Sequence, residues 1–193
     1  EHMMFNGTKT RAPGEFDRIM EGSGGSNNAY TSSDVTVYQN WFPASVTSLI
    51  FDLESDRMRN LDFDAGKVES ERGVVFSERR SSVDNDNFGT LLEQMQATAF
   101  VAHPYQIPII GWPSDIEGWK VADLQDYYHR YYAPNNAVMF IVGDVDPEAV
   151  FKLADQYLAG IPAQPAPPAV TTKEPPQLGE RRLRIERDAQ TPL

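Results

Sequence analysis

The sequence contains no cysteine, which excludes disulfide bonds and thiolate metal ligands within these 193 residues. Positive charge is scarce as well: 17 basic side chains stand against 28 acidic ones, and the formal net charge is −11. Because binding to phosphates requires a cationic surface, this balance argues against a nucleic-acid-binding protein. No apolar run approaches the roughly 18 residues of a membrane-spanning helix, so we expect no membrane span in this sequence.

Apolar residues make up 40% of the sequence, which is typical of a globular protein with a hydrophobic core. Apolar side chains at helical spacing predict a set of helices: 13–21, 44–59, 64–82, 88–101, 121–132 and 147–158. Residues that favour β-structure predict strands at 28–41 and at 136–142, the second of them buried. Long helices mixed with strands, without a regular βαβ alternation, favour an α+β fold.

The expected domain organisation follows from a change in composition late in the chain. Residues 1–160 are expected to form one α+β domain that is truncated in this sequence. Residues 161–178 are rich in proline and predict an extended connector. Residues 179–193 alternate apolar and charged side chains, which predicts the start of a further strand of the same domain.

Four charged or titratable residues are candidates for a metal site. Glu1 and His2 open the chain, and Glu71 and Glu78 lie seven residues apart in the predicted helix 64–82. Seven residues are just under two helical turns, so both carboxylates share one face of that helix. Carboxylates with an imidazole suit a divalent cation and a general base. Neighbouring arginines also allow a plainer interpretation, a solvated helix face with ion pairs.

The segment 1–8, Glu-His-Met-Met-Phe-Asn-Gly-Thr, resembles the second half of the inverted zinc motif H-x-x-E-H. This motif belongs to the pitrilysin or insulinase-type peptidases, which include mitochondrial processing peptidase. In that family a glutamate some seventy-odd residues further on, the second of an E-x6-E pair, completes the metal site, and Glu78 lies 76 residues after His2. The segments 24–31 and 132–144 also resemble family segments, a substrate-lining edge strand and a helix-to-strand connection.

The resemblance implies a mostly antiparallel sheet with helices packed on one face, as in the N-terminal domain of that family. It implies a zinc-dependent endopeptidase in which His2 and Glu78 bind Zn2+. Glu1 would be the general base, and Glu71 would orient Glu78 or the attacking water.

The same resemblance implies a substrate site on the edge strand. Asn28, Ala29 and Thr31 would bind an extended peptide or unfolded protein by β-strand addition.

The first histidine of the motif would lie three positions before Glu1, outside this sequence. We therefore expect a fragment of a longer peptidase that binds zinc poorly and is inactive in isolation. Its expected partners are the missing C-terminal half or a partner subunit, and truncated sheet edges predict self-association. The compartment is not determined by the sequence, although bacterial relatives favour a periplasmic or secreted protein.

Two other functions stay open at this point. A non-catalytic relative would bind extended peptides as a scaffold without cutting them. A subunit of a processing peptidase would need a partner chain for activity.

Overall fold

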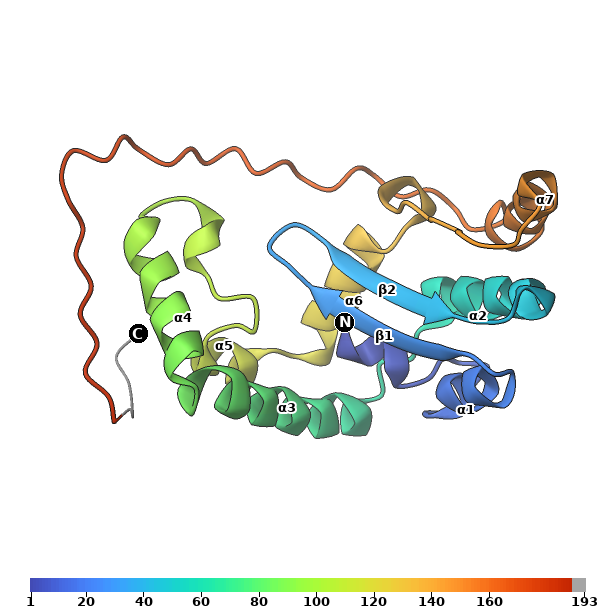
Figure 1. Ribbon diagram of the computed structural model, residues 1–193, viewed down its shortest axis with the longest axis horizontal. Helices are drawn as coiled ribbons and strands as arrows, with labels where there is room; N and C mark the ends of the chain where they lie inside the picture. The colour runs from blue at the N-terminus through green and yellow to red at the C-terminus, as the bar shows by residue number, and fades with distance from the viewer. Residues whose placement is uncertain (189–193) are drawn as a thin grey trace. The chain divides into compact units, whose positions relative to one another are not determined.

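The computed structural model describes residues 1–188, which form two compact units. The first unit contains residues 1–68 and 120–168, and the second contains residues 69–119 and the described residues from 169 onward. The prediction of an α+β fold is confirmed: helices dominate, and the described sheet is a two-stranded antiparallel hairpin (Figure 1). Within the described residues, no helix has the length and apolar character needed to cross a bilayer.

The first unit combines the hairpin with helices from both ends of its sequence. Its elements are the 3-10 turns η1 (His2–Phe5), η2 (Ala44–Val46) and η5 (Pro134–Asn136), the strands β1 (Ser26–Thr31) and β2 (Thr36–Trp41), and the helices α1 (Glu15–Gly22), α2 (Thr47–Asn60), α6 (Val121–Tyr131) and α7 (Pro147–Leu158). Helix α1 packs beside β1, and α2 packs beside α7. The predicted strand 28–41 is therefore a hairpin, because residues 32–35 form a turn between two strands.

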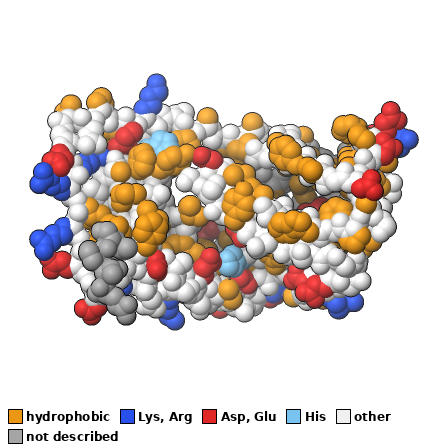
Figure 2. Space-filling view, in the orientation of Figure 1, with side chains coloured by type: hydrophobic (Ala, Val, Ile, Leu, Met, Phe, Trp, Pro, Cys, Tyr) orange, Lys and Arg blue, Asp and Glu red, His pale blue; other side chains and the backbone are white. Residues whose placement is uncertain are grey.

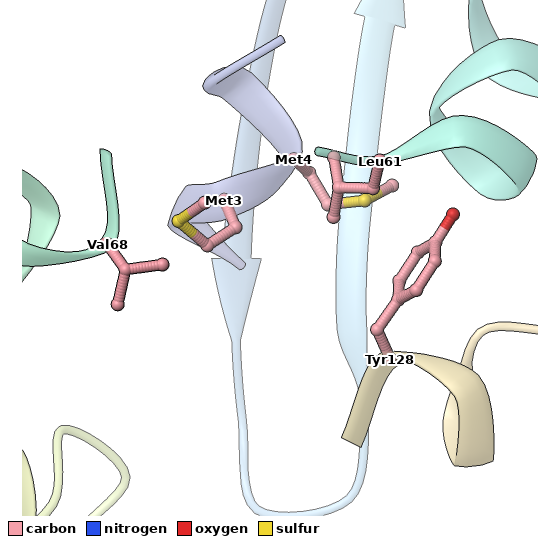
Figure 3. Packing of buried hydrophobic residues seen from close by; sticks show 5 residues of the cluster. All are labelled: Met3, Met4, Leu61, Val68 and Tyr128. Carbon is pink, nitrogen blue, oxygen red and sulfur yellow. The ribbon is translucent and has the colours of Figure 1, made fainter. Parts of the chain in front are cut away.

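Two hydrophobic clusters hold this unit together. One brings η1, the end of α2, the start of α3 and α6 into contact, and Figure 3 shows its buried members Met3, Met4, Leu61, Val68 and Tyr128. The Tyr128 hydroxyl donates to the backbone carbonyl of Arg57 at 2.9 Å, which joins α6 to α2. The other cluster packs α1 on α2 through Phe16, Met20, Ile50 and Leu53.

The second unit is helical. It contains most of α3 (Ala65–Arg79), the π-helical turn η3 (Arg80–Asp84), α4 (Asn87–Ala99), the 3-10 turn η4 (Pro104–Gln106) and α5 (Pro113–Gly118). Helix α4 begins at an aspartate cap, since the Asp86 carboxylate accepts a hydrogen bond from the Gly89 amide. The side chain of Val75 in α3 is buried.

The expected buried strand at 136–142 is wrong. Residues 137–142 have no strand partner in the described chain, and they are extended and exposed, with Phe140 84% and Val142 95% accessible. Composition predicted the extended backbone, but a strand also needs a neighbour to satisfy its amides and carbonyls. Apolar side chains exposed on the molecular surface are visible in Figure 2.

Residues 162–188 contain no helix or strand. The segment predicted to be a connector, 161–178, makes specific contacts. The Glu174 carboxylate accepts hydrogen bonds from three consecutive backbone amides, those of Val101, Ala102 and His103, at 2.8–3.0 Å. No strand is present between residues 179 and 188, and the rest of the strand predicted at 179–193 lies outside the described residues.

Candidate active site

The chain begins with a short turn that presents Glu1 and His2. The two residues that follow, Met3 and Met4, are buried in the first hydrophobic cluster (Figure 3). Their burial anchors η1 to the rest of the first unit. The turn closes through hydrogen bonds from the Met4 amide to the Glu1 carbonyl and from the Asn6 amide to the Met3 carbonyl. It ends at Gly7, whose φ of +85° and close approach to the Arg11 carbonyl leave no space for a Cβ. Glu1 is therefore an exposed residue on a backbone segment that its buried neighbours hold in place.

The tip of the hairpin meets this turn. The Thr31 hydroxyl, at the end of β1, donates a hydrogen bond to the Glu1 carboxylate. Thr31 pairs in register with Thr36 of β2, and their hydroxyl oxygens are 3.1 Å apart. The strand that was predicted to bind substrate is thus in direct contact with the residue predicted to act as general base.

The backbone of β1 offers an edge for a further strand. The Ser32 amide donates to the Val35 carbonyl, so residues 32 and 35 form a hydrogen-bonded pair. Antiparallel pairs alternate, so the Thr31–Thr36 and Ala29–Tyr38 pairs are of the other kind. The amides and carbonyls of Ala29 and Thr31 consequently point away from β2. The side-chain oxygen of Asn28 accepts a hydrogen bond from this outward Ala29 amide at 2.9 Å.

A pair of partly buried phenols joins the hairpin to the end of α6. The hydroxyls of Tyr38 in β2 and of Tyr132, which follows α6, are 2.7 Å apart. Burial raises the pKa of both phenols above the ordinary value of about 10, so both stay protonated at neutral pH. Tyr38 lies two residues from Thr36 along β2, so their side chains share one face of the hairpin.

A buried arginine supports the phenols. The Arg57 side chain of α2 is 1% exposed, and its guanidinium carbon lies 4.4 Å from the ring centre of Phe16 and 4.8 Å from that of Tyr38. Its charge is balanced by Glu54, which accepts hydrogen bonds from Nε at 2.7 Å and from Nη2 at 2.5 Å. Asn40 of β2 donates to the same carboxylate at 2.6 Å. Sequence reasoning did not identify Arg57, Tyr38 or Tyr132.

Glu71 and Glu78 lie on α3, as predicted, in the part of the helix that belongs to the second unit. The arginines that follow them have other partners. Arg72 donates to the carbonyls of Glu117 at 3.0 Å and Trp119 at 2.9 Å. Arg79 is buried and bonded to Glu93. At Arg79 the helix is therefore not the solvated ion-pair face that the charge pattern also allowed.

The structure brings Glu1, His2 and Thr31 together in the first unit and carries Glu71 and Glu78 on the second. Within residues 1–188, no group of three or more His, Asp or Glu side chains is gathered around one point in the manner of a metal site. The zinc site that would join His2 to Glu78 stays a prediction.

Comparison with known proteins defines the class. Residues 1–112 match the sequence family described as insulinase (peptidase family M16), and residues 118–193 match the peptidase M16 inactive domain. The chain therefore belongs to peptidase family M16.

Individual relatives agree with this assignment. The chain is 36% identical over 192 residues to the zinc protease PqqE of Helicobacter pylori, covering 97% of this chain and 43% of that protein. The crystal structure of a protease from Helicobacter pylori superposes with a TM-score of 0.91 at 36% identity, covering 94% of this chain and 44% of the other. The periplasmic protease PqqL of Escherichia coli gives a TM-score of 0.80 at 28% identity, covering 91% and 20%. The chain thus spans less than half the length of these relatives.

Proposed function

We propose that the whole protein containing this chain is a zinc-dependent endopeptidase that cleaves extended peptides or unfolded proteins. The observation that carries the proposal is the placement of Glu1 beside His2 on an anchored turn, in hydrogen-bond contact with a strand whose outer edge faces away from its partner. A base beside an open strand edge is the arrangement that hydrolysis of an extended backbone requires.

The donor set fits zinc in kind. His2 and Glu78 would supply an imidazole nitrogen and a carboxylate oxygen, ligand types that zinc accepts, and catalytic zinc sites use three protein ligands in all. A zinc ion held there would lower the pKa of a water molecule to roughly 7 and polarise the scissile carbonyl. Glu71 lies about two turns before Glu78 on the same face of α3, and it would orient the Glu78 carboxylate or the water.

The residues of the first unit would do the remaining work. Glu1 would accept the proton of the attacking water and pass it to the leaving amine. The substrate backbone would pair with the outward amides and carbonyls of Ala29 and Thr31, as an added strand. A substrate carbonyl would replace the side-chain oxygen of Asn28 on the Ala29 amide, which leaves the Asn28 side chain to contact the substrate.

The test is peptide hydrolysis by the whole protein. With zinc present we expect cleavage of an unfolded polypeptide, loss of cleavage on chelation, and recovery when zinc is restored. Glu1→Gln should lower kcat by about a hundredfold or more, because a general base contributes roughly that much. Glu21→Gln, at the exposed end of α1, is the matched control and should leave kcat unchanged. Full activity in Glu1→Gln would refute the assignment of the base.

A non-catalytic peptide-binding relative is the second candidate. The match of residues 118–193 to a domain described as inactive favours it. It predicts that the zinc-loaded protein binds an unfolded polypeptide with measurable affinity and leaves it intact over hours. A processing-peptidase subunit differs from both, since cleavage would begin only when the partner chain is added.

We also propose partners and a location. The whole protein would combine the present residues with a second half or a partner subunit, and the chain as given would bind zinc poorly because His2 and Glu78 are fewer ligands than a catalytic site uses. The Escherichia coli neighbour is named a periplasmic protease, which supports a periplasmic location for this protein. Cell fractionation with a cytoplasmic marker enzyme tests the location directly.

A further inference from the structure

The contact between Thr31 and Glu1 has a defined direction. A carboxylate can only accept a hydrogen bond, so the single hydroxyl proton of Thr31 is committed to Glu1. In the 3.1 Å contact between Thr31 and Thr36, the donor must then be Thr36. The Thr36 proton is therefore committed to the Thr31 oxygen. Each hydroxyl has one proton, so the Glu1 carboxylate fixes the direction of both hydrogen bonds.

Two partly buried tyrosines pack against the first hydrophobic cluster next to these threonines. Tyr38 and Tyr132 lie 2.7 Å apart between their hydroxyl oxygens, with their rings packed at a centroid distance of 6.3 Å. The Arg57 guanidinium packs on the Tyr38 ring and is itself tied to Glu54. Thr36 thus lies two residues along β2 from a tyrosine that packs against the core of the first unit, and Thr31 is its cross-strand partner.

We propose that Thr31 is a positioning residue that fixes the orientation of the Glu1 carboxylate for proton transfer. One carboxylate oxygen accepts from Thr31, and this hydrogen bond restricts rotation of the carboxylate that would take the proton of the attacking water. The backbone of the same residue faces the open edge of β1, so the strand that would receive the substrate also aligns the base. This inference rests on the proposed function, since it assigns Thr31 a role in that reaction.

The chain offers a well-matched set of variants. Thr31→Val has nearly the same shape as threonine and lacks the hydroxyl, whereas Thr31→Ser keeps the hydroxyl and loses a methyl group. Thr98→Val makes the same chemical change in α4, where the hydroxyl only bonds the carbonyl of Gln94 in its own helix. Steady-state kinetics on an unfolded polypeptide are measured with the zinc-loaded whole protein, together with zinc content and melting temperature.

The expected result is a loss of kcat by about ten- to a hundredfold in Thr31→Val, the factor that corresponds to one hydrogen bond to a charged group. KM, zinc content and melting temperature should stay at their wild-type values, because the substrate would use the backbone of residue 31. Thr31→Ser should recover most of the loss, and Thr98→Val should match the wild type.

The outcomes separate the inference from the proposed function. If the zinc-loaded wild type cleaves no polypeptide, both are wrong. If Glu1→Gln abolishes cleavage while Thr31→Val keeps the wild-type kcat, the proposed function stands and the positioning role is overturned. A Thr31→Val effect confined to KM, or a loss of kcat that Thr31→Ser does not recover, also overturns it.

Discussion

The ion pair between Arg79 and Glu93 provides a quantitative test of what holds the second unit together. Arg79 ends α3 and is 4% exposed, and Glu93 in α4 is 8% exposed. Nη1 of Arg79 donates to one carboxylate oxygen at 2.7 Å and Nη2 to the other at 3.2 Å. Nη1 also donates to the Gly111 carbonyl at 2.9 Å. The hydrogen bonds that Arg79 donates to Glu93 raise the pKa of Arg79, so the cation stays charged at every working pH.

We expect Glu93→Gln to destabilise the chain by about 3 kcal/mol. The substitution keeps the size of the side chain but leaves a buried cation without its counter-charge, and breaking a buried ion pair costs about 3–5 kcal/mol. The lower end applies because Asp84, which is half-exposed, lies 3.4 Å from Nη2 and can take over part of the interaction. In urea denaturation the midpoint should fall by roughly 1–3 M at an unchanged slope.

Two variants make the test specific. Glu69→Gln removes an exposed ion pair with Arg72 on the same helix and should cost about 1 kcal/mol at most. Replacing both buried partners by methionine should recover much of the Glu93→Gln loss, because no charge is left buried. A loss below 1 kcal/mol in Glu93→Gln, or a double variant less stable than the single one, would refute the reasoning. Arg79 directly follows Glu78, so the same substitution should weaken zinc binding by the whole protein.

Three further predictions concern other parts of the chain. Burial alone would raise the pKa of Asp56, but hydrogen bonds from Thr8, Asn60, Thr10 and Arg11 lower it. The pKa of an aspartate in the unfolded chain, near 3.9, is higher than the pKa of Asp56 in the folded chain. The destabilisation by Asp56→Asn should therefore be full above about pH 5 and fade as the pH falls through the folded pKa. The control Asp155→Asn, at an exposed position, should show no such trend. The unpaired segment 137–142 should make the chain associate with rising concentration, and Phe140→Glu should reduce the apparent mass in light scattering; equal masses for both proteins would contradict this. Glu174→Gln should speed proteolytic cleavage within 161–178, because this segment loses the carboxylate that holds it to the amides of residues 101–103. If Glu174→Gln is cleaved no faster than the control Glu180→Gln, this contact does not order the segment.

Most of the helices could be predicted from the sequence, because each carries its own periodic signal. Apolar spacing located α2 and α6 to within a few residues. The short helix α5 lies where no helix was predicted, although Pro113 at its first position and Asp115 in its first turn are ordinary start signals. The strand expected at 136–142 failed for another reason, since strand formation depends on a neighbour that no local pattern reveals.

The candidate site was predictable only where a motif carried it. The spacing of Glu1, His2, Glu71 and Glu78 predicted a family that the comparison confirms, and the site that these four residues would form stays a prediction. The cluster of Arg57, Tyr38 and Tyr132 could not be predicted from the sequence. These residues come from three separate elements that only folding brings together. The alternation of Thr36 and Tyr38 along β2 did place them on one face of the hairpin, but no sequence pattern says that this face meets the start of the chain.

The register of the hairpin explains why one strand can both receive a substrate and orient a base. Along a strand, the side-chain face and the direction of the backbone amides alternate with the same period of two. Ala29 and Thr31 therefore share an outward-facing backbone, and their side chains share the face on which the Thr31 hydroxyl reaches Glu1. Their cross-strand partners Tyr38 and Thr36 lie on this face as well, where Arg57 packs. A slip of one residue would turn the amides inward and the hydroxyl away from Glu1 at once, so binding geometry and base alignment depend on the same register.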